Sequence, residues 1–303
     1  MNAIAKKTFY SGLFLFALLA FSMCDYVKEP YQNLAPIGSS ANAIIDSMTG
    51  TLDKKIFIED YTGHTCGNCP KAVDTINTIY NLYPGRVIAV GIHSGYYSAL
   101  QSPDYTYNFV LEDPVTPGYN ELDNFFQISA NGNPNGMVNR KEYDASTQTH
   151  IKGIDQWRTY AAQVMQDTVK VQLSLMTSTD TVTAHSVVST IKVKYLYNLS
   201  GDYKLAAFII EDSVEKPQKD YRFNPDDILD YTHRHVLRGY MYGAFGEQVG
   251  AQNPLQNSTD TKTYAITIPS SIARIKHCAL VAYVYNAATY EVLQAEELEL
   301  IPH

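Results

Sequence analysis

The sequence has few basic residues. It holds 23 Lys and Arg against 31 Asp and Glu, which gives a net charge of -8. Proteins that bind nucleic acids need clustered positive charge to neutralise the phosphates. The composition therefore argues against a nucleic acid as the partner. Lys6 and Lys7 lie in an N-terminal segment that has no acid, so the rest of the chain is more acidic still.

Cysteine is rare as well. The chain of 303 residues has four, at Cys24, Cys66, Cys69 and Cys278. Small secreted domains that depend on disulfides are much richer in cysteine, so a disulfide scaffold is excluded. Cys278 lies in an alternating apolar pattern, and we expect it to be a buried core residue.

Long apolar runs are missing after residue 24, so we expect no membrane-spanning helix in the mature chain. Residues 1–23 resemble an export signal, with two lysines followed by an apolar run over residues 13–21 that is too short to span a bilayer. The cysteine that follows, Cys24, resembles the acylated first residue of a bacterial lipoprotein. Simple cleavage without a lipid is the alternative. Acylation would anchor the protein to a membrane.

The length suggests two domains after this segment. Residues 24–50 have little periodicity and contain Pro, Gly and Ser, which is typical of a tether. We predict a first domain over residues 51–167. From Thr168 onward the pattern changes to alternating apolar and polar residues, which predicts an all-β domain over residues 168–303.

Two of the cysteines lie between a predicted strand and a predicted helix. Residues 54–61 are almost continuously apolar, which is typical of a strand buried on both faces. Apolar residues then recur at helical spacing after Cys69, and Pro84-Gly85 ends the helix. Residues 86–92 form a second apolar run. This predicts a β-α-β unit with two parallel strands, and Cys66 and Cys69 at the start of its helix.

This position suits thiol chemistry. Unpaired N–H groups and the dipole at a helix N-terminus favour negative charge on sulfur. Two intervening residues allow Cys69 to reach Cys66 and close a disulfide. We therefore predict that Cys66 is the attacking thiol and Cys69 the resolving one.

Three further residues are candidates for this site. His64 precedes the cysteines, and His93 follows the second strand, at the sheet edge where the first strand also ends. A protonated imidazole near Cys66 would lower the thiol pKa. Asp60 ends the first strand, and its carboxylate could accept a proton from Cys69. Ordinary hydrogen-bonded loop histidines and a strand-end acid are the alternatives.

The run of strand, C-x-x-C, helix and strand, followed by Asn133-Pro134 before a short strand, resembles thioredoxin. The resemblance implies that Pro134 belongs to a cis-proline loop that faces the cysteines and holds a partner's backbone. It also implies that Asp60 is a buried acid behind them. One position departs from the pattern. Thr65 stands where thioredoxins have Trp, so the surface that docks partners must differ.

A second resemblance covers nearly all of the mature chain. Its motifs are residues 59–70, residues 136–140, and residues 235–247, which include His235-Val236-Leu237-Arg238-Gly239. They resemble the Omp28-related outer-membrane lipoprotein family. The resemblance implies a fold class of α/β thioredoxin-like domain followed by an all-β, immunoglobulin-like sandwich. It also implies a lipid anchor in the outer membrane.

Three functions follow as hypotheses. The first is thiol–disulfide exchange on envelope or surface proteins that contain cysteines. The second is a surface binding or adhesion module, in which the C-x-x-C is a structural disulfide and the Tyr-rich residues 94–120 and the sandwich form the contact surface. The third is a metal site made by Cys66, Cys69, His64 and His93, although structural zinc sites usually have a second close-spaced pair. We predict no cofactor.

Overall fold

The computed structural model describes residues 44–47, 52–109, 120–180, 186–269, 272 and 274–301. The predicted export signal (residues 1–23), the lipidation site Cys24 and most of the tether lie outside these residues. Among the described residues, no helix is long and apolar enough to cross a membrane.

The predicted β-α-β unit is present. Strand β2 (Ile56–Thr62), helix α1 (Pro70–Leu82) and strand β3 (Val87–His93) follow one another. β2 and β3 are parallel and paired along their whole length. Their residues are buried on both faces, apart from the partly exposed end of β2. Both strands end at the same sheet edge, which therefore carries the C-x-x-C and His93.

These strands belong to a much larger sheet. β3 pairs in parallel with β13, which pairs with β8, and β8 continues to β16. The nine-stranded sheet runs in the order β17 (Val292–Glu299), β16 (Cys278–Asn286), β8 (Tyr203–Glu211), β13 (Val236–Tyr240), β3, β2, β4 (Asn135–Val138), β5 (Lys152–Gly153), with β14 (Glu247–Gln248) paired to β8.

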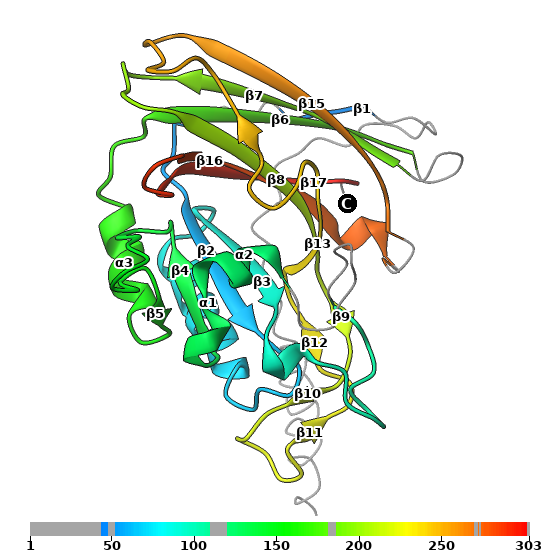
Figure 1. The fold of residues 1–303 in the computed structure, drawn as a ribbon. Helices are drawn as coiled ribbons and strands as arrows, with labels where there is room; N and C mark the ends of the chain where they lie inside the picture. Colours follow the sequence, from blue (N-terminus) through cyan, green and yellow to red (C-terminus); the bar gives the residue numbers. More distant parts are fainter. Residues whose placement is uncertain are drawn as a thin grey trace, which may run out of the picture. The chain divides into compact units, whose positions relative to one another are not determined.

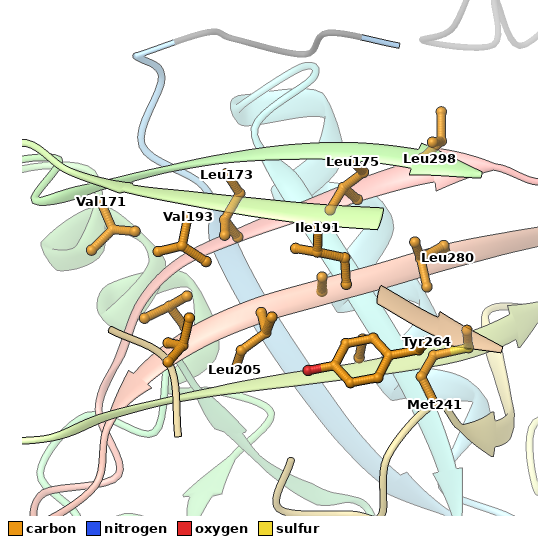
Figure 2. Packing of buried hydrophobic residues seen from close by; sticks show 14 of the residues in the cluster. Val171, Leu173, Leu175, Ile191, Val193, Leu205, Met241, Tyr264, Leu280 and Leu298 are labelled. Atoms are coloured by element: carbon orange, nitrogen blue, oxygen red, sulfur yellow. The ribbon is translucent and has the colours of Figure 1, made fainter. Parts of the chain in front are cut away.

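A second sheet covers one face of β8 and β16. It has four antiparallel strands in the order β1 (Ile44–Ser47), β6 (Val171–Asp180), β7 (Ser186–Tyr195), β15 (Thr259–Thr267). Buried and exposed residues alternate along β7, so one face turns inward. Figure 2 shows Leu173, Ile191 and Val193 meeting Leu205 and Leu280 from the large sheet. This apolar layer makes the upper half of the molecule a β-sandwich (Figure 1).

The predicted fold class is wrong. The described residues contain seventeen strands and three α-helices, so the protein is mostly β. No separate α/β thioredoxin-like domain precedes a separate immunoglobulin-like sandwich, because one sheet contains strands from both halves of the chain. The physical reason lies in β8 and β16, which are buried on both faces. One face packs on the four-stranded sheet and the other on residues of β2, β3 and α2. The domain boundary at residues 167 and 168 stays a prediction.

Three helices cover the β2–β3–β4 part of the large sheet. α1 and α3 (Trp157–Val164) pack on one face, around Ile56, Ile58 and Trp157. α2 (Glu121–Phe126) packs on the other, with Leu122 and Phe126. The short 3₁₀ turns are η1 (Tyr96–Ser98), η2 (Ser129–Asn131) and η3 (Ile275–His277).

A hairpin between β8 and β13 was not predicted. It is built from β9 (Val214–Glu215), β10 (Gln218–Lys219), β11 (Asp227–Ile228) and β12 (Thr232–His233). β9 pairs with β12, and β10 with β11. We call residues 214–233 the hairpin arm.

Candidate functional site

Cys66 and Cys69 form a disulfide at the N-terminus of α1, with their Cα atoms 5.4 Å apart. Cys69 is the N-cap and Pro70 the first helical residue, where a missing N–H costs little. The Cys69 amide donates to the Cys66 carbonyl, which closes the turn. Both cysteines are buried, with 3% and 2% of their surface exposed. The disulfide is therefore not presented to solvent.

The loop before the disulfide is held from one side by η1. The Thr65 amide and hydroxyl both donate to the Tyr97 carbonyl, at 3.1 and 3.0 Å. Gly63 lies against the same residue, and a Cβ at Gly63 would stand 2.4 Å from the Tyr97 carbonyl carbon. Because no side chain fits there, the glycine is required by this close approach of two backbones.

The hairpin arm holds the same loop from the other side. The Gln218 side-chain amide donates to the carbonyls of Cys66 and Gly63, at 3.0 and 3.3 Å. The Lys219 amide donates to the His64 carbonyl at 2.8 Å, and the Tyr221 amide to the Gly67 carbonyl at 2.9 Å.

The tip of the arm covers the turn between the cysteines. A Cβ on Gly67 would lie 2.3 Å from the ring of Tyr221, so this ring packs directly on the glycine. Arg222 then bridges Asp220 of the arm to Asp74 of α1. The arm is therefore attached both to the disulfide loop and to the helix that follows it.

Three buried histidines gather beside this loop, around the ring of Phe109. The Phe109 ring stacks on His93 with centroids 3.8 Å apart, and lies 4.7 Å from His233 and 5.7 Å from His64. The three residues come from the disulfide loop, the end of β3 and the hairpin arm. The sequence identified His64 and His93 as neighbours of the site, but His233 was missed because it is distant in sequence.

Burial favours the neutral form of all three imidazoles. Burial lowers the pKa of His64, lowers that of His93 well below its usual value, and lowers that of His233 to about 3. Among the described residues, neither ring nitrogen of His93 has a hydrogen-bond partner. A neutral imidazole does not stabilise a thiolate. The activating role predicted for His64 and His93 therefore gains no support from the geometry.

Asp60 and Pro134 lie at the same end of β2. Asp60 is buried on the α1 side, and its Oδ1 atom has no partner among the described residues. Burial raises the pKa of Asp60 to about 8. The Asn133–Pro134 bond is cis, and Pro134 comes just before Asn135, which pairs with Tyr61. The catalytic roles of Asp60 and Pro134 stay predictions.

A metal site does not form from these residues as they stand. In the part of the chain that the structure describes, no three His, Cys, Asp or Glu side chains are grouped to hold a metal ion. The cysteine sulfurs are bonded to each other, and the Phe109 ring stands among the histidines.

The motif residues outside the disulfide loop form buried ion pairs. Arg140 donates through Nε and Nη2 to the two carboxylate oxygens of Glu59, at 2.8 and 2.7 Å, and both side chains are inaccessible. Arg140 also donates to the Tyr283 hydroxyl at 2.7 Å and lies over the Phe126 ring. The Glu59–Arg140 pair joins β2 to the segment after β4, and the bond to Tyr283 joins both to β16.

A second buried pair ties β8 to β13. Arg238 lies 3.1 Å from Glu211 and donates to the Tyr107 hydroxyl. Gly246, in the same motif, has φ +59° and leaves 1.9 Å between an added Cβ and the Leu205 carbonyl oxygen. The motif residues outside the disulfide loop therefore stabilise the large sheet.

A group of aromatic side chains reaches the surface on the other face of the sheet. Phe125, Tyr143, Phe245 and Tyr290 come from four separate segments, and we call them the surface aromatic cluster. Ring centroids lie 4.7 Å apart for Tyr143 and Tyr290, 5.1 Å for Phe125 and Phe245, and 5.2 Å for Phe125 and Tyr290. Phe125 is 42% exposed and the other three are half-buried. The high tyrosine content was the one sequence signal for such a surface.

A family model described as outer membrane protein Omp28 matches residues 121–300, which is more than half of the chain. The chain belongs to the Omp28 family. Membership confirms the predicted family and the predicted location at the outer membrane. The Omp28 model covers two of the three motifs, those at residues 136–140 and 235–247. A comparison with curated proteins found no match.

Solved structures with a similar fold were also found. HBP35 of Porphyromonas gingivalis is 17% identical, with a TM-score of 0.56 over 83% of this chain and 77% of that chain. An Agrobacterium tumefaciens protein is 14% identical, with a TM-score of 0.48 over 83% and 96%. A domain of the outer membrane lipoprotein Omp28 from Porphyromonas gingivalis is 17% identical, with a TM-score of 0.30 over 45% and 93%. At these identities, the likeness to HBP35 shows a shared fold and nothing about activity.

Proposed function

We propose that this Omp28-family protein is a binding module of the outer membrane, and that Cys66–Cys69 is a structural disulfide. The observation that carries the proposal is the burial of both cysteines beneath the hairpin arm. Exchange requires a thiolate to approach a disulfide sulfur along an open path. Reactive cysteines are accessible and lie in electropositive surroundings, whereas these are covered and have neutral imidazoles beside them. Thiol–disulfide exchange therefore finds no support in the site.

The surface aromatic cluster is the proposed contact surface. Large aromatic side chains provide much of the contact area in protein interfaces, and tyrosine combines an apolar ring with a polar end. The cluster is held in place from below, because Phe126 and Tyr285 contact its rings and Arg140 fixes Phe126. A rigid aromatic surface loses little conformational entropy on binding. The partner class is a protein segment with aliphatic or aromatic side chains.

Photo-cross-linking in intact cells tests this function. We expect p-benzoylphenylalanine at position 125 to give an adduct of one defined mass. The same group at Tyr197, an aromatic residue that is 48% exposed and outside the cluster, is the matched control and should give none. Tyr290→Ser should reduce the adduct at position 125 at least fivefold.

The adduct should persist in a Cys66→Ser/Cys69→Ser variant, because binding does not use the sulfurs. A thermal melt of this variant checks that it remains folded. Equal adducts from positions 125 and 197 would overturn the contact surface. Loss of the adduct in the folded double variant would overturn the structural role of the disulfide.

A further inference from the structure

The hairpin arm meets the rest of the protein in two zones. In the first, the backbone of Lys219 and Tyr221 and the side chain of Gln218 hydrogen-bond to the disulfide loop. In the second, His233 of the arm packs against His93 and Phe109. The first zone covers the cysteines, and the second contains ionisable groups. Undocking the arm would therefore expose the disulfide.

The second zone is built for neutral imidazoles. The Nε2–H of His233 donates to the Lys216 carbonyl at 3.2 Å, and that of His64 donates to the Ala99 carbonyl at 3.0 Å. His93 has a ring centroid 5.2 Å from that of His233, and both of its nitrogens are buried without a partner in the described structure. A charge on any of these rings would be desolvated, and charges on His93 and His233 together would repel each other.

From this geometry we propose that the hairpin arm is an acid-released latch, which protonation of His64, His93 and His233 lifts from the Cys66–Cys69 loop. The latch is independent of the proposed contact surface, which lies in α2 and three loops outside the arm. Its consequence is that the buried disulfide becomes accessible in acid while the rest of the fold stays intact.

The groups that face the three histidines do not offset such a charge. Arg238 of β13 acts on His93 as a further positive charge. Glu211 partly offsets that charge, because its carboxylate lies 3.1 Å from the Arg238 guanidinium. Aromatic rings also face the histidines. Tyr105 lies against His64, Tyr231 against His233, and Phe109 against all three. Two lysines of the arm lie over neighbouring rings, Lys216 over Tyr107 and Lys219 over Tyr105. Lys219 is paired with Asp226 and Asp227, so its charge is offset. Asp60 lies near Tyr231, and burial raises the pKa of Asp60 to about 8, which favours its neutral form.

Linkage sets the size of the effect. Once released into water, a histidine regains a pKa of about 6.5. Between pH 7.5 and 5.0 each histidine that charges only in the released state shifts the opening equilibrium toward release by about thirtyfold. Two such histidines would shift it by nearly a thousandfold. The pH dependence is therefore steep even where the released state is rare.

The rate at which a water-soluble phosphine reduces Cys66–Cys69 in the full mature chain measures the latch. We expect the rate to rise more than tenfold from pH 7.5 to pH 5.0. His93→Phe keeps the stacking on Phe109, and His233→Gln keeps an N–H donor for the Lys216 carbonyl. The double variant of both should change less than threefold. Gly67→Ala, whose Cβ clashes with the Tyr221 ring, is the control with a disturbed cover over the turn and should react faster than the wild type at pH 7.5.

Amide hydrogen exchange separates release of the arm from general unfolding. At pH 5.0 the amides of Lys219 and Tyr221 should lose protection, while those of Ile209 and Val281 in the central strands keep it. A reduction rate that does not change with pH in the wild type would overturn the proposal. So would a double histidine variant that keeps the full pH dependence, or a loss of protection in the central strands at the same pH.

Discussion

Replacing Arg140 with Met is expected to lower the free energy of unfolding by about 3–5 kcal/mol. Arg140 and Glu59 are both inaccessible to solvent, and two hydrogen bonds from the guanidinium reach the two carboxylate oxygens. Removing the guanidinium leaves the Glu59 carboxylate buried without its counter-charge. It also leaves the Tyr283 hydroxyl without the donor that it now accepts from. Urea unfolding followed by far-UV circular dichroism measures the change.

The matched control is the double variant Glu59→Met/Arg140→Met. A buried ion pair costs desolvation energy that a pair of apolar side chains does not, so removing both charges together is often close to neutral. We therefore expect the double variant to recover most of the stability that Arg140→Met loses. A loss of less than 1 kcal/mol for Arg140→Met would contradict the role of this pair in joining β2 to β16.

Asp60→Asn is expected to remove a large pH dependence of stability. Burial raises the pKa of Asp60 to about 8, whereas the unfolded chain has a pKa near its ordinary value of about 3.9. Between these values the folded protein holds a proton that the unfolded chain has released. The Asp60 contribution is therefore fully present below about pH 4 and is lost as the pH rises through about 8, with a slope of about -1.4 kcal/mol per pH unit.

The difference between wild type and Asp60→Asn isolates this group, because other titrations cancel. Measured from pH 5 to pH 8, Asp60→Asn should gain stability relative to the wild type by a few kcal/mol. The buried histidines act in the opposite direction, since their lowered pKa values remove stability as the pH falls below about 6.5. Asp104→Asn, at an exposed position, is the control and should leave the pH dependence unchanged. Parallel pH curves for Asp60→Asn and the wild type would show that Asp60 is ionised in the folded state.

Local patterns allowed a good part of the structure to be predicted. The apolar runs at residues 54–61 and 86–92 are β2 and β3, and the helical spacing after Cys69 is α1. These elements bury faces that each segment defines by itself, so their period is visible in the sequence. The placement of Cys66 and Cys69 at the start of α1 followed from the same patterns.

The fold class could not be predicted in this way. Continuous burial of β8 and β16 requires a second layer on each face, but it does not identify the layer. The pairing of β3 with β13 joins residues 87–93 to residues 236–240, and the match between them is a single bridge, Val236 with Gly91. A contact so short and so distant in sequence has no periodic signal. The sequence therefore suggested two separate domains where one nine-stranded sheet joins strands from both halves of the chain.

The burial of the disulfide could not be predicted either, because it depends on residues that are distant in sequence. The residues that cover it, Gln218 and Tyr221, are about 150 positions away and belong to a hairpin with two-residue strands. Within the C-x-x-C segment, Gly67 was the one residue that reflects this packing, because its missing side chain makes room for Tyr221. In an unaligned sequence, such a glycine is equally consistent with an open C-x-x-C turn.

The reduction potential of Cys66–Cys69 at pH 7 tests the central claim most directly. Equilibration of the purified mature chain with defined thiol–disulfide buffers, followed by mass measurement of alkylated thiols, gives this value. A structural disulfide beneath the arm predicts a potential below about -300 mV. A value between about -270 and -120 mV, the range of thiol–disulfide oxidoreductases, would contradict the claim that this disulfide is structural.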